Sequence, residues 1–212
     1  MLPELARNQT AEIFRQIINE SPQAGSEIKT RQERELGHAA DVANWIIILS
    51  PDATLDLQVA GWLHDCERLV DNEGTVGFKG DRTSPEYLAH KKGHAKRSAD
   101  LAKVMLQRFG FSASNIDRTY FLILHHDDTG EEIDKIGDEE LTILAAADSL
   151  SFFTFIAADM LQREGESRLQ DKANFMVDKM SSGIRKLLGD QQITDPTISR
   201  VKNQALAKYQ QG

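Results

Sequence analysis

The stretch LTILAAADSLSFFTFIAADML, residues 141–161, decides the fold class of this chain. Apolar residues lie on nearly every side of it when it is drawn with the period of a helix, and a helix that is apolar all round is normally buried. The acidic run Asp138-Glu139-Glu140 just before it suits the first turn of a helix, where negative charge is favourable. We therefore expect a central, buried helix with other helices packed around it.

Amphipathic helical patterns flank this central segment, and no run of alternating strand residues is convincing. Proline, glycine and capping residues mark where they stop or start, as at Ser21-Pro22, Ser84-Pro85-Glu86 and Gly110. The glycine-containing segment 71–83 is the one clear long loop. The predicted helices are 5–20, about 28–49, one carrying His64-Asp65, about 85–109, about 114–126, and two or three within about 165–212, broken near 189–196. The sequence predicts an all-α fold.

Length, charge and cysteine content restrict the class of protein. A chain of 212 residues is long enough for a single domain with a sizeable core, and we expect residues 1–212 to form one. Its formal net charge of -8 makes it a poor electrostatic partner for long nucleic acid. Cys66 is the only cysteine, so a reduced compartment is expected, and apolar runs such as Trp45 to Leu49 are too short to span a bilayer. These features favour a cytoplasmic protein with no membrane partner.

Asp148 lies inside the apolar central helix, where a carboxylate is costly unless it is paired or binds a metal. The histidines all lie between positions 38 and 126, next to apolar helical sequence. Successive groups are separated by about one helix and a connection, so each group could reach one interior point from a different helix, as in metal sites of helical bundles. The ordered set is His38, His64-Asp65, His94, His125-His126 and Asp148.

Mixed imidazole and carboxylate ligands suit Fe, Mn, Co, Ni or Zn rather than Mg or Ca. A carboxylate can bridge two metals, and Asp65 is the natural residue to be shared. A single histidine in an apolar helix is more often a satisfied core residue than a ligand, and His125-His126 could simply stabilise a helix end. The ordered combination favours a divalent-metal site that uses His38, His64, Asp65 and Asp148.

The pattern His38 … His64-Asp65 … Asp148 resembles the HD superfamily of metal-dependent phosphohydrolases. The segment ELGHAADVANW is similar to the helix carrying the family's first histidine, AGWLHDCERL to its His-Asp helix, and LAAADSLSFF to the helix with its final aspartate. The resemblance covers about residues 30–160 and leaves 161–212 as a C-terminal helical extension. It implies an HD-type helical bundle that hydrolyses phosphate esters or anhydrides.

The longer order H…HD…H…HH…D is similar to binuclear branches of that superfamily, among them cyclic-dinucleotide phosphodiesterases with a Gly-Tyr-Pro motif and hydrolases of diadenosine tetraphosphate. The resemblance implies a second metal held by Asp65, His94 and His125, with His126 as a further candidate ligand. Two departures count against the cyclic-dinucleotide assignment. The sequence DDTGEEIDKIG after the tandem histidines has no Gly-Tyr-Pro, and Arg34 replaces a glutamate used by some of those enzymes. A mononuclear site with the other histidines lining the pocket stays an alternative.

His90 and His94 are four residues apart and share a helix face, which is also metal-ligand spacing. We favour His94 as the ligand, because GHAKRSADLA is more similar to the family's middle-histidine helix.

Cationic groups are needed to hold phosphate oxygens. Arg68 follows His64 by one helical turn, and Arg97 follows His94 on nearly the same face, so both are candidate catalytic residues beside Asp65. The alternative for Arg68 is a surface charge paired with Asp71 or Glu67. Lys79 and Arg82 lie in the glycine-rich loop, which could cover the pocket.

The leading hypothesis is a metal-dependent phosphohydrolase that uses metal-activated water on a small phosphorylated metabolite, most plausibly a nucleotide. Its cofactor would be one or two divalent transition-metal ions. A non-catalytic HD-like sensor of metal and nucleotide, and an HD-type di-iron oxygenase, are the alternatives. The C-terminal helices outside the family-like region could form a homodimer surface.

Overall fold

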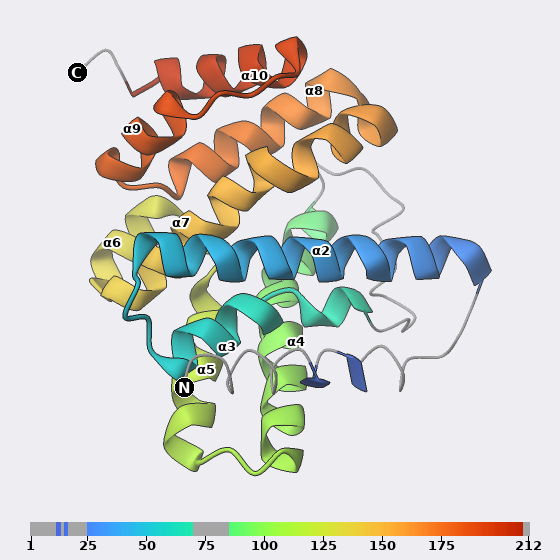
Figure 1. Ribbon diagram of the computed structural model, residues 1–212, viewed down its shortest axis with the longest axis vertical. Helices are drawn as coiled ribbons and strands as arrows, with labels where there is room; N and C mark the ends of the chain where they lie inside the picture. The colour runs from blue at the N-terminus through green and yellow to red at the C-terminus, as the bar shows by residue number, and fades with distance from the viewer. Residues whose placement is uncertain (1–11, 14, 17–24, 70–84, 210–212) are drawn as a thin grey trace.

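The computed structural model describes residues 12, 13, 15, 16, 25–69 and 85–209, with the side chains of 25–31, 87, 88 and 90–92 not included. These residues form helices and no strand, so the all-α prediction is confirmed (Figure 1). The helices are α2 (Gly25–Leu49), α3 (Leu55–Leu63), the 3-10 turn η1 (Cys66–Leu69), α4 (Pro85–Arg108), α5 (Ala113–His125), α6 (Gly130–Ile136), α7 (Glu139–Ser151), the π-helical turn η2 (Phe152–Ile156), α8 (Ala157–Asp178), α9 (Ser182–Asp190) and α10 (Pro196–Ala207).

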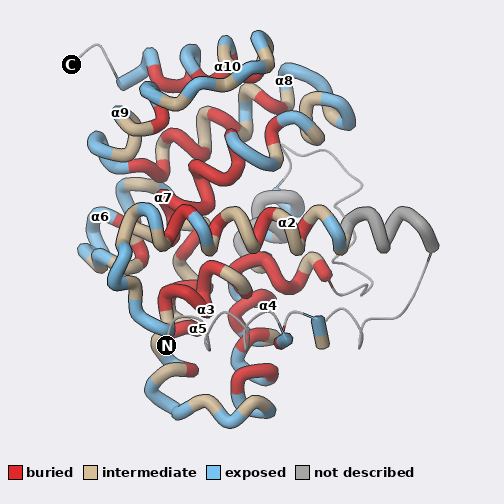
Figure 2. Tube along the Cα trace, in the orientation of Figure 1, coloured by how far each residue is buried: buried red, intermediate tan, exposed pale blue. Residues whose placement is uncertain are grey.

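Helix α2 crosses the middle of the molecule and packs against α3 and α7, while α4 and α5 pair on one side and α8 to α10 stack on the other (Figure 1). Helix α7 is the central element that the sequence predicts. Asp138 caps its N-terminus by accepting a hydrogen bond from the Leu141 backbone N–H, and the residues from Leu144 to Ser151 are buried (Figure 2). This burial places Asp148 in the interior.

The helical run Glu139–Asp178 is long and apolar enough to cross a membrane by length and composition alone. However, 67% of its most apolar window is buried inside the protein. A buried core helix passes the same test, so the run is only weak evidence for a membrane span.

Helix α3 approaches α2 closely at Gly61. A Cβ at this position would meet the end of the Ile46 side chain of α2, so the glycine leaves room for that side chain between the two helices. The sequence predicts that His64-Asp65 lies within the third helix, but α3 ends at Leu63. The chain tightens there, because the Arg68 N–H bonds to the Asp65 carbonyl oxygen at 3.0 Å, three residues back.

Helix α8 consists of two arms joined at Gly165. This glycine has a φ of 80°, a left-handed conformation that ends the first arm. Figure 1 shows the chain turning back there, so that the second arm returns towards α7. A contact of 3.8 Å between Ser149 Oγ and Met176 Sδ confirms the return. The C-terminal segment therefore comes back to the centre of the molecule.

Some predictions lie outside the described residues: the helix 5–20 apart from four of its residues, and the loop 71–83 with Lys79 and Arg82. Helix α6 was not predicted. It begins with Thr129 as N-cap, and the Glu132 side chain completes a capping box.

Candidate metal centre

His64 and Asp65 lie at the junction of α3 and η1, where both side chains are buried. His64 Nδ1 lies 2.9 Å from the Gly61 carbonyl oxygen. A carbonyl can only accept, so Nδ1 carries the proton and donates it. In the neutral ring Nε2 is then left with a free lone pair, which is the form that binds a metal.

The first cluster joins α2, α3 and α7. His38 Nε2 lies 3.3 Å from His64 Nε2 and 3.2 Å from Asp148 Oδ1, and His64 Nε2 lies 3.7 Å from the same oxygen. Asp65 Oδ2 is 3.6 Å from His64 Nε2. The four residues that the sequence predicts as ligands of one metal thus place buried ligand atoms close to His64 Nε2.

The spacing of these atoms fits a metal ion. With metal–nitrogen bonds of about 2.1 Å, two nitrogens separated by the distance between His38 and His64 would subtend an angle of about 104° at the ion. That angle lies between octahedral and tetrahedral values. The separation of the His38 and His64 nitrogens is therefore compatible with binding of one divalent transition metal.

The second cluster joins Asp65 to α4 and the end of α5. His94 Nε2 contacts Asp65 Oδ1, and His126 Nε2 lies 3.7 Å from that oxygen. Ligand atoms of Asp65, His94 and His126 all lie within 4.8 Å of one another, as do those of His38, His64 and Asp65. Asp65 is the residue shared by the two clusters, and it turns a different oxygen to each.

Each of the four cluster histidines has its Nδ1 engaged by a second group, while its Nε2 faces the clusters. His126 Nδ1 donates to the Ile123 carbonyl oxygen at 2.7 Å, and His94 Nδ1 donates to the Glu67 carboxylate. His38 Nδ1 lies 3.0 Å from Ser151 Oγ. Metal-binding histidines commonly have such partners, which fix the tautomer and the ring orientation.

One protein-family model matches residues 8–200, which is most of the chain and includes both clusters; it is described as a domain of unknown function (DUF4202). The chain belongs to the DUF4202 family. Neither the curated proteins nor the solved structures contain a match. Because the family description gives no activity, the role of this DUF4202 site has to be inferred from its chemistry.

The tandem histidines of this DUF4202 chain separate on folding. His126 is buried in the second cluster, whereas His125 is part-exposed, bonds to Asp128 Oδ2 at 2.7 Å and packs beside Phe121. The structure therefore does not bring His125 to the clusters, and the preference for His125 over His126 is corrected. Adjacent residues of a helix point about 100° apart, and at the end of α5 it is the position of His126 that faces the interior.

The two predicted arginines occupy different positions. Arg68 Nη1 lies 2.6 Å from Asp65 Oδ2, and its Nη2 is 3.4 Å from His94 Nε2. Its side chain is 39% exposed, so it connects the clusters with solvent. Arg97 instead binds Glu67 through Nε and Nη2, which places it behind His94 rather than at the metal ligands. The side chain of His90 lies outside the described residues.

Four charged residues beside the clusters were not predicted to belong to the site. Glu67 lies in η1, two residues after Asp65. Glu35 lies three residues before His38 on the same helix, and this spacing, which puts both on one helix face, could have indicated that it lies near the site. The other two depend on long-range folding. They are Asp127, which follows the tandem histidines, and Lys179, at the end of α8.

Electrostatics keeps the buried carboxylates ready to bind a cation. Burial would raise the pKa of Asp65, but the Arg68 guanidinium and nearby imidazoles hold it well below its usual range. Burial would also raise the pKa of Asp148, and Lys179 with two histidines outweighs that effect. Burial lowers the pKa of His126. Both aspartates are thus ionised and His126 is neutral near pH 7, as metal ligands must be.

Cys66 follows the His64-Asp65 pair but belongs to the packing. Burial raises the pKa of its thiol, and Sγ donates a hydrogen bond of 3.3 Å to the Ser98 carbonyl oxygen. A thiol in this state is a poor nucleophile.

Proposed function

We propose that this protein is a metal-dependent phosphohydrolase of the HD type, acting on a small phosphorylated compound, with nucleotides as the first substrate class. The observation that carries the proposal is the pair of buried His/Asp clusters joined by Asp65. Their mixed nitrogen and oxygen ligands suit Fe, Mn, Co, Ni or Zn. A divalent ion bound there supplies Lewis acidity and lowers the pKa of a water molecule to near neutrality.

The chain's own residues would divide the remaining tasks. Asp65 turns one oxygen to each cluster and so would fix the two sets of ligands relative to each other. The four histidines have their Nδ1 atoms engaged by other groups and turn Nε2 towards the clusters, where each could give a lone pair to a metal. Arg68, which is part-exposed beside Asp65, would bind a phosphate oxygen that approaches from solvent. This arrangement suits attack on phosphorus in a substrate small enough to reach a buried centre.

The direct test is a substrate screen on purified protein, after its metal content has been measured and exchanged. Nucleotides, dinucleoside polyphosphates, sugar phosphates and a chromogenic phosphate diester would each be assayed with Mn, Fe, Co, Ni and Zn. We expect phosphate release that depends on the metal and disappears with a chelator. Metal binding with no turnover of any phosphorylated compound would favour the sensor alternative. Metal-dependent oxygen consumption, seen only in aerobic assays, would favour the di-iron oxygenase.

Replacing Arg68 with methionine is expected to lower kcat/KM for the substrate found by about 10- to 100-fold, mostly through KM. The reason is the loss of a charge-assisted hydrogen bond worth about 1.5–3 kcal/mol. Because Arg68 also donates to Asp65, metal affinity should be titrated on the same variant and kcat/KM compared at saturating metal, which separates substrate binding from metal binding. The matched control is Arg200→Met, since Arg200 pairs with Glu166 at the surface, away from the clusters. Unchanged kcat/KM in Arg68→Met would remove Arg68 from substrate binding.

A further inference from the structure

Lys179 has a fully buried side chain that ends beside the first cluster. It is the C-cap of α8, and its Nζ lies 2.8 Å from Asp148 Oδ2 and 3.2 Å from Asp127 Oδ1. An ammonium group buried to this degree is costly unless it is paired, and here two carboxylates pair with it. The residue comes from the segment that the sequence resemblance leaves outside the family-like core.

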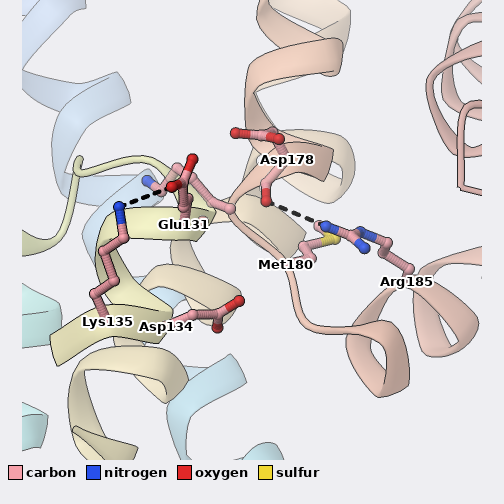
Figure 3. A pocket seen from close by; sticks show the side chains of 8 residues that line it. Glu131, Asp134, Lys135, Asp178, Met180 and Arg185 are labelled. Carbon is pink, nitrogen blue, oxygen red and sulfur yellow. Dashed lines mark hydrogen bonds and ion pairs between the residues drawn. The ribbon is translucent and has the colours of Figure 1, made fainter. Parts of the chain in front are cut away.

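The backbone around Lys179 is fixed from both sides. The Arg185 guanidinium of α9 donates to the carbonyl oxygens of Val177 and Asp178, at 3.1 and 3.3 Å. Figure 3 shows the bond to Asp178. On the α6 side, Gly130 approaches the Asp178 carbonyl so closely that a side chain there would collide with it. A cavity of about 380 Å³ lies over this turn, lined by α6 and the start of α9. Lys179 is therefore held at one position between that surface cavity and the buried clusters.

The two oxygens of Asp148 have different partners. Oδ1 faces His38 Nε2 at 3.2 Å and His64 Nε2 at 3.7 Å, whereas Oδ2 is bonded to Lys179. A carboxylate can bind a metal through one oxygen or through both. Because Lys179 engages Oδ2, only Oδ1 is presented to the first cluster.

The ammonium also lies within a third group of possible ligands. His126, Asp127 and Asp148 bring ligand atoms within 4.8 Å of one another, and Lys179 Nζ is bonded to both of these aspartates. A positive charge at that point opposes the entry of a further cation. The lysine thus pairs with Asp127 and with the Asp148 oxygen that does not face His38 and His64.

We propose that Lys179 is a positioning residue that makes Asp148 a one-oxygen ligand of the first cluster and keeps the third group closed to metal. The proposal rests on the metal site of the proposed function. Lys179 does not touch substrate, and it acts through Asp148 by fixing the orientation of the carboxylate. The C-terminal segment is then part of the metal centre.

The test uses Co²⁺ as the probe, because its visible absorption responds to coordination number and its binding can be titrated. Lys179→Met keeps an unbranched side chain that is one atom shorter and removes its charge. We expect about 10- to 100-fold weaker Co²⁺ binding, as for loss of other groups that orient metal ligands. We also expect an absorption change towards higher coordination number, because Asp148 Oδ2 is released. The matched control is Lys202→Met, another buried lysine, whose Nζ bonds to the carbonyl oxygens of Leu188, Gly189 and Gln191.

Lys202→Met should lower thermal stability and leave the Co²⁺ spectrum and affinity unchanged, which separates positioning from general packing. If Lys179→Met does not fold, Lys179→Gln removes the charge but leaves a polar end group beside Asp127 and Asp148, and it should change the spectrum in the same direction. A wild-type spectrum and affinity in the folded variant would overturn the role of Lys179. Failure of the wild-type protein to bind Co²⁺ would instead overturn the metal site itself.

Discussion

Replacing Asp65 with asparagine is expected to remove metal binding at both clusters and to lower the proposed phosphohydrolase activity by about 10³-fold or more, a loss of roughly 4 kcal/mol in transition-state stabilisation. Asp65 Oδ2 faces His64 and Arg68, and Oδ1 faces His94 and His126. Asparagine removes the charge and turns an NH₂ group, which is no metal ligand, towards one of the clusters. No other residue in the described part of the chain contributes to both clusters.

Metal content by mass spectrometry, activity, and circular dichroism on the same samples test this prediction. The helical signal should persist, because the change alters one polar atom in a helical core. Asp128→Asn is the matched control: Asp128 pairs with His125 at the edge of the site and should keep metal and activity. Full metal content and full activity in Asp65→Asn would contradict both the shared-ligand role and the proposed mechanism.

Substitution of His125 and His126 should show which of these adjacent histidines binds metal. His126→Ala is expected to reduce the bound metal from about two ions to one, because it removes a buried nitrogen of the second cluster. His125→Ala should leave two ions bound, since His125 is part-exposed and bonds to Asp128. His94→Ala should give the same loss as His126→Ala.

Quantitative metal analysis after equilibration with a limited excess of Mn²⁺ or Co²⁺ would check the stoichiometry. Thermal melting of each variant without metal shows whether the change in stoichiometry reflects a loss of fold. The opposite result, with His125→Ala losing an ion and His126→Ala keeping both, would exclude the second cluster. A single ion in the wild-type protein and in all three variants would favour the mononuclear alternative.

The sequence was sufficient for the fold class and for most residues of the buried His/Asp clusters, because both depend on local pattern. The apolar run around Asp148 predicts a buried helix, and the carboxylate inside it predicts a partner or a metal. The spacing of His38, His64 and His94 predicts delivery from separate helices. Helix α6 could also have been predicted, since Thr129 and Glu132 have capping-box spacing.

Other features depend on how each helix is rotated about its own axis, and the spacing of residues in the sequence predicts that rotation poorly. His125 and His126 differ by one position, so a small error in that setting exchanges the buried ring for the part-exposed one. Arg97 follows His94 by one turn, yet it binds Glu67 behind the imidazole. Lys179 reaches Asp148 only because the chain reverses between them, and no local signal indicates that contact.

The reversal at Gly165 has a consequence for how chain length can vary in this family. Each residue added to or removed from either arm of α8 would turn the rest of that arm by about 100° and shift it by about 1.5 Å. Such a change would carry Lys179 away from Asp148 Oδ2. Residues added at the tip beside Gly165 would leave both arms in register, because exposed turns accept insertions far better than packed helices. Differences in length between relatives should therefore collect at this tip, which is also the natural point for inserting a tag or a reporter domain.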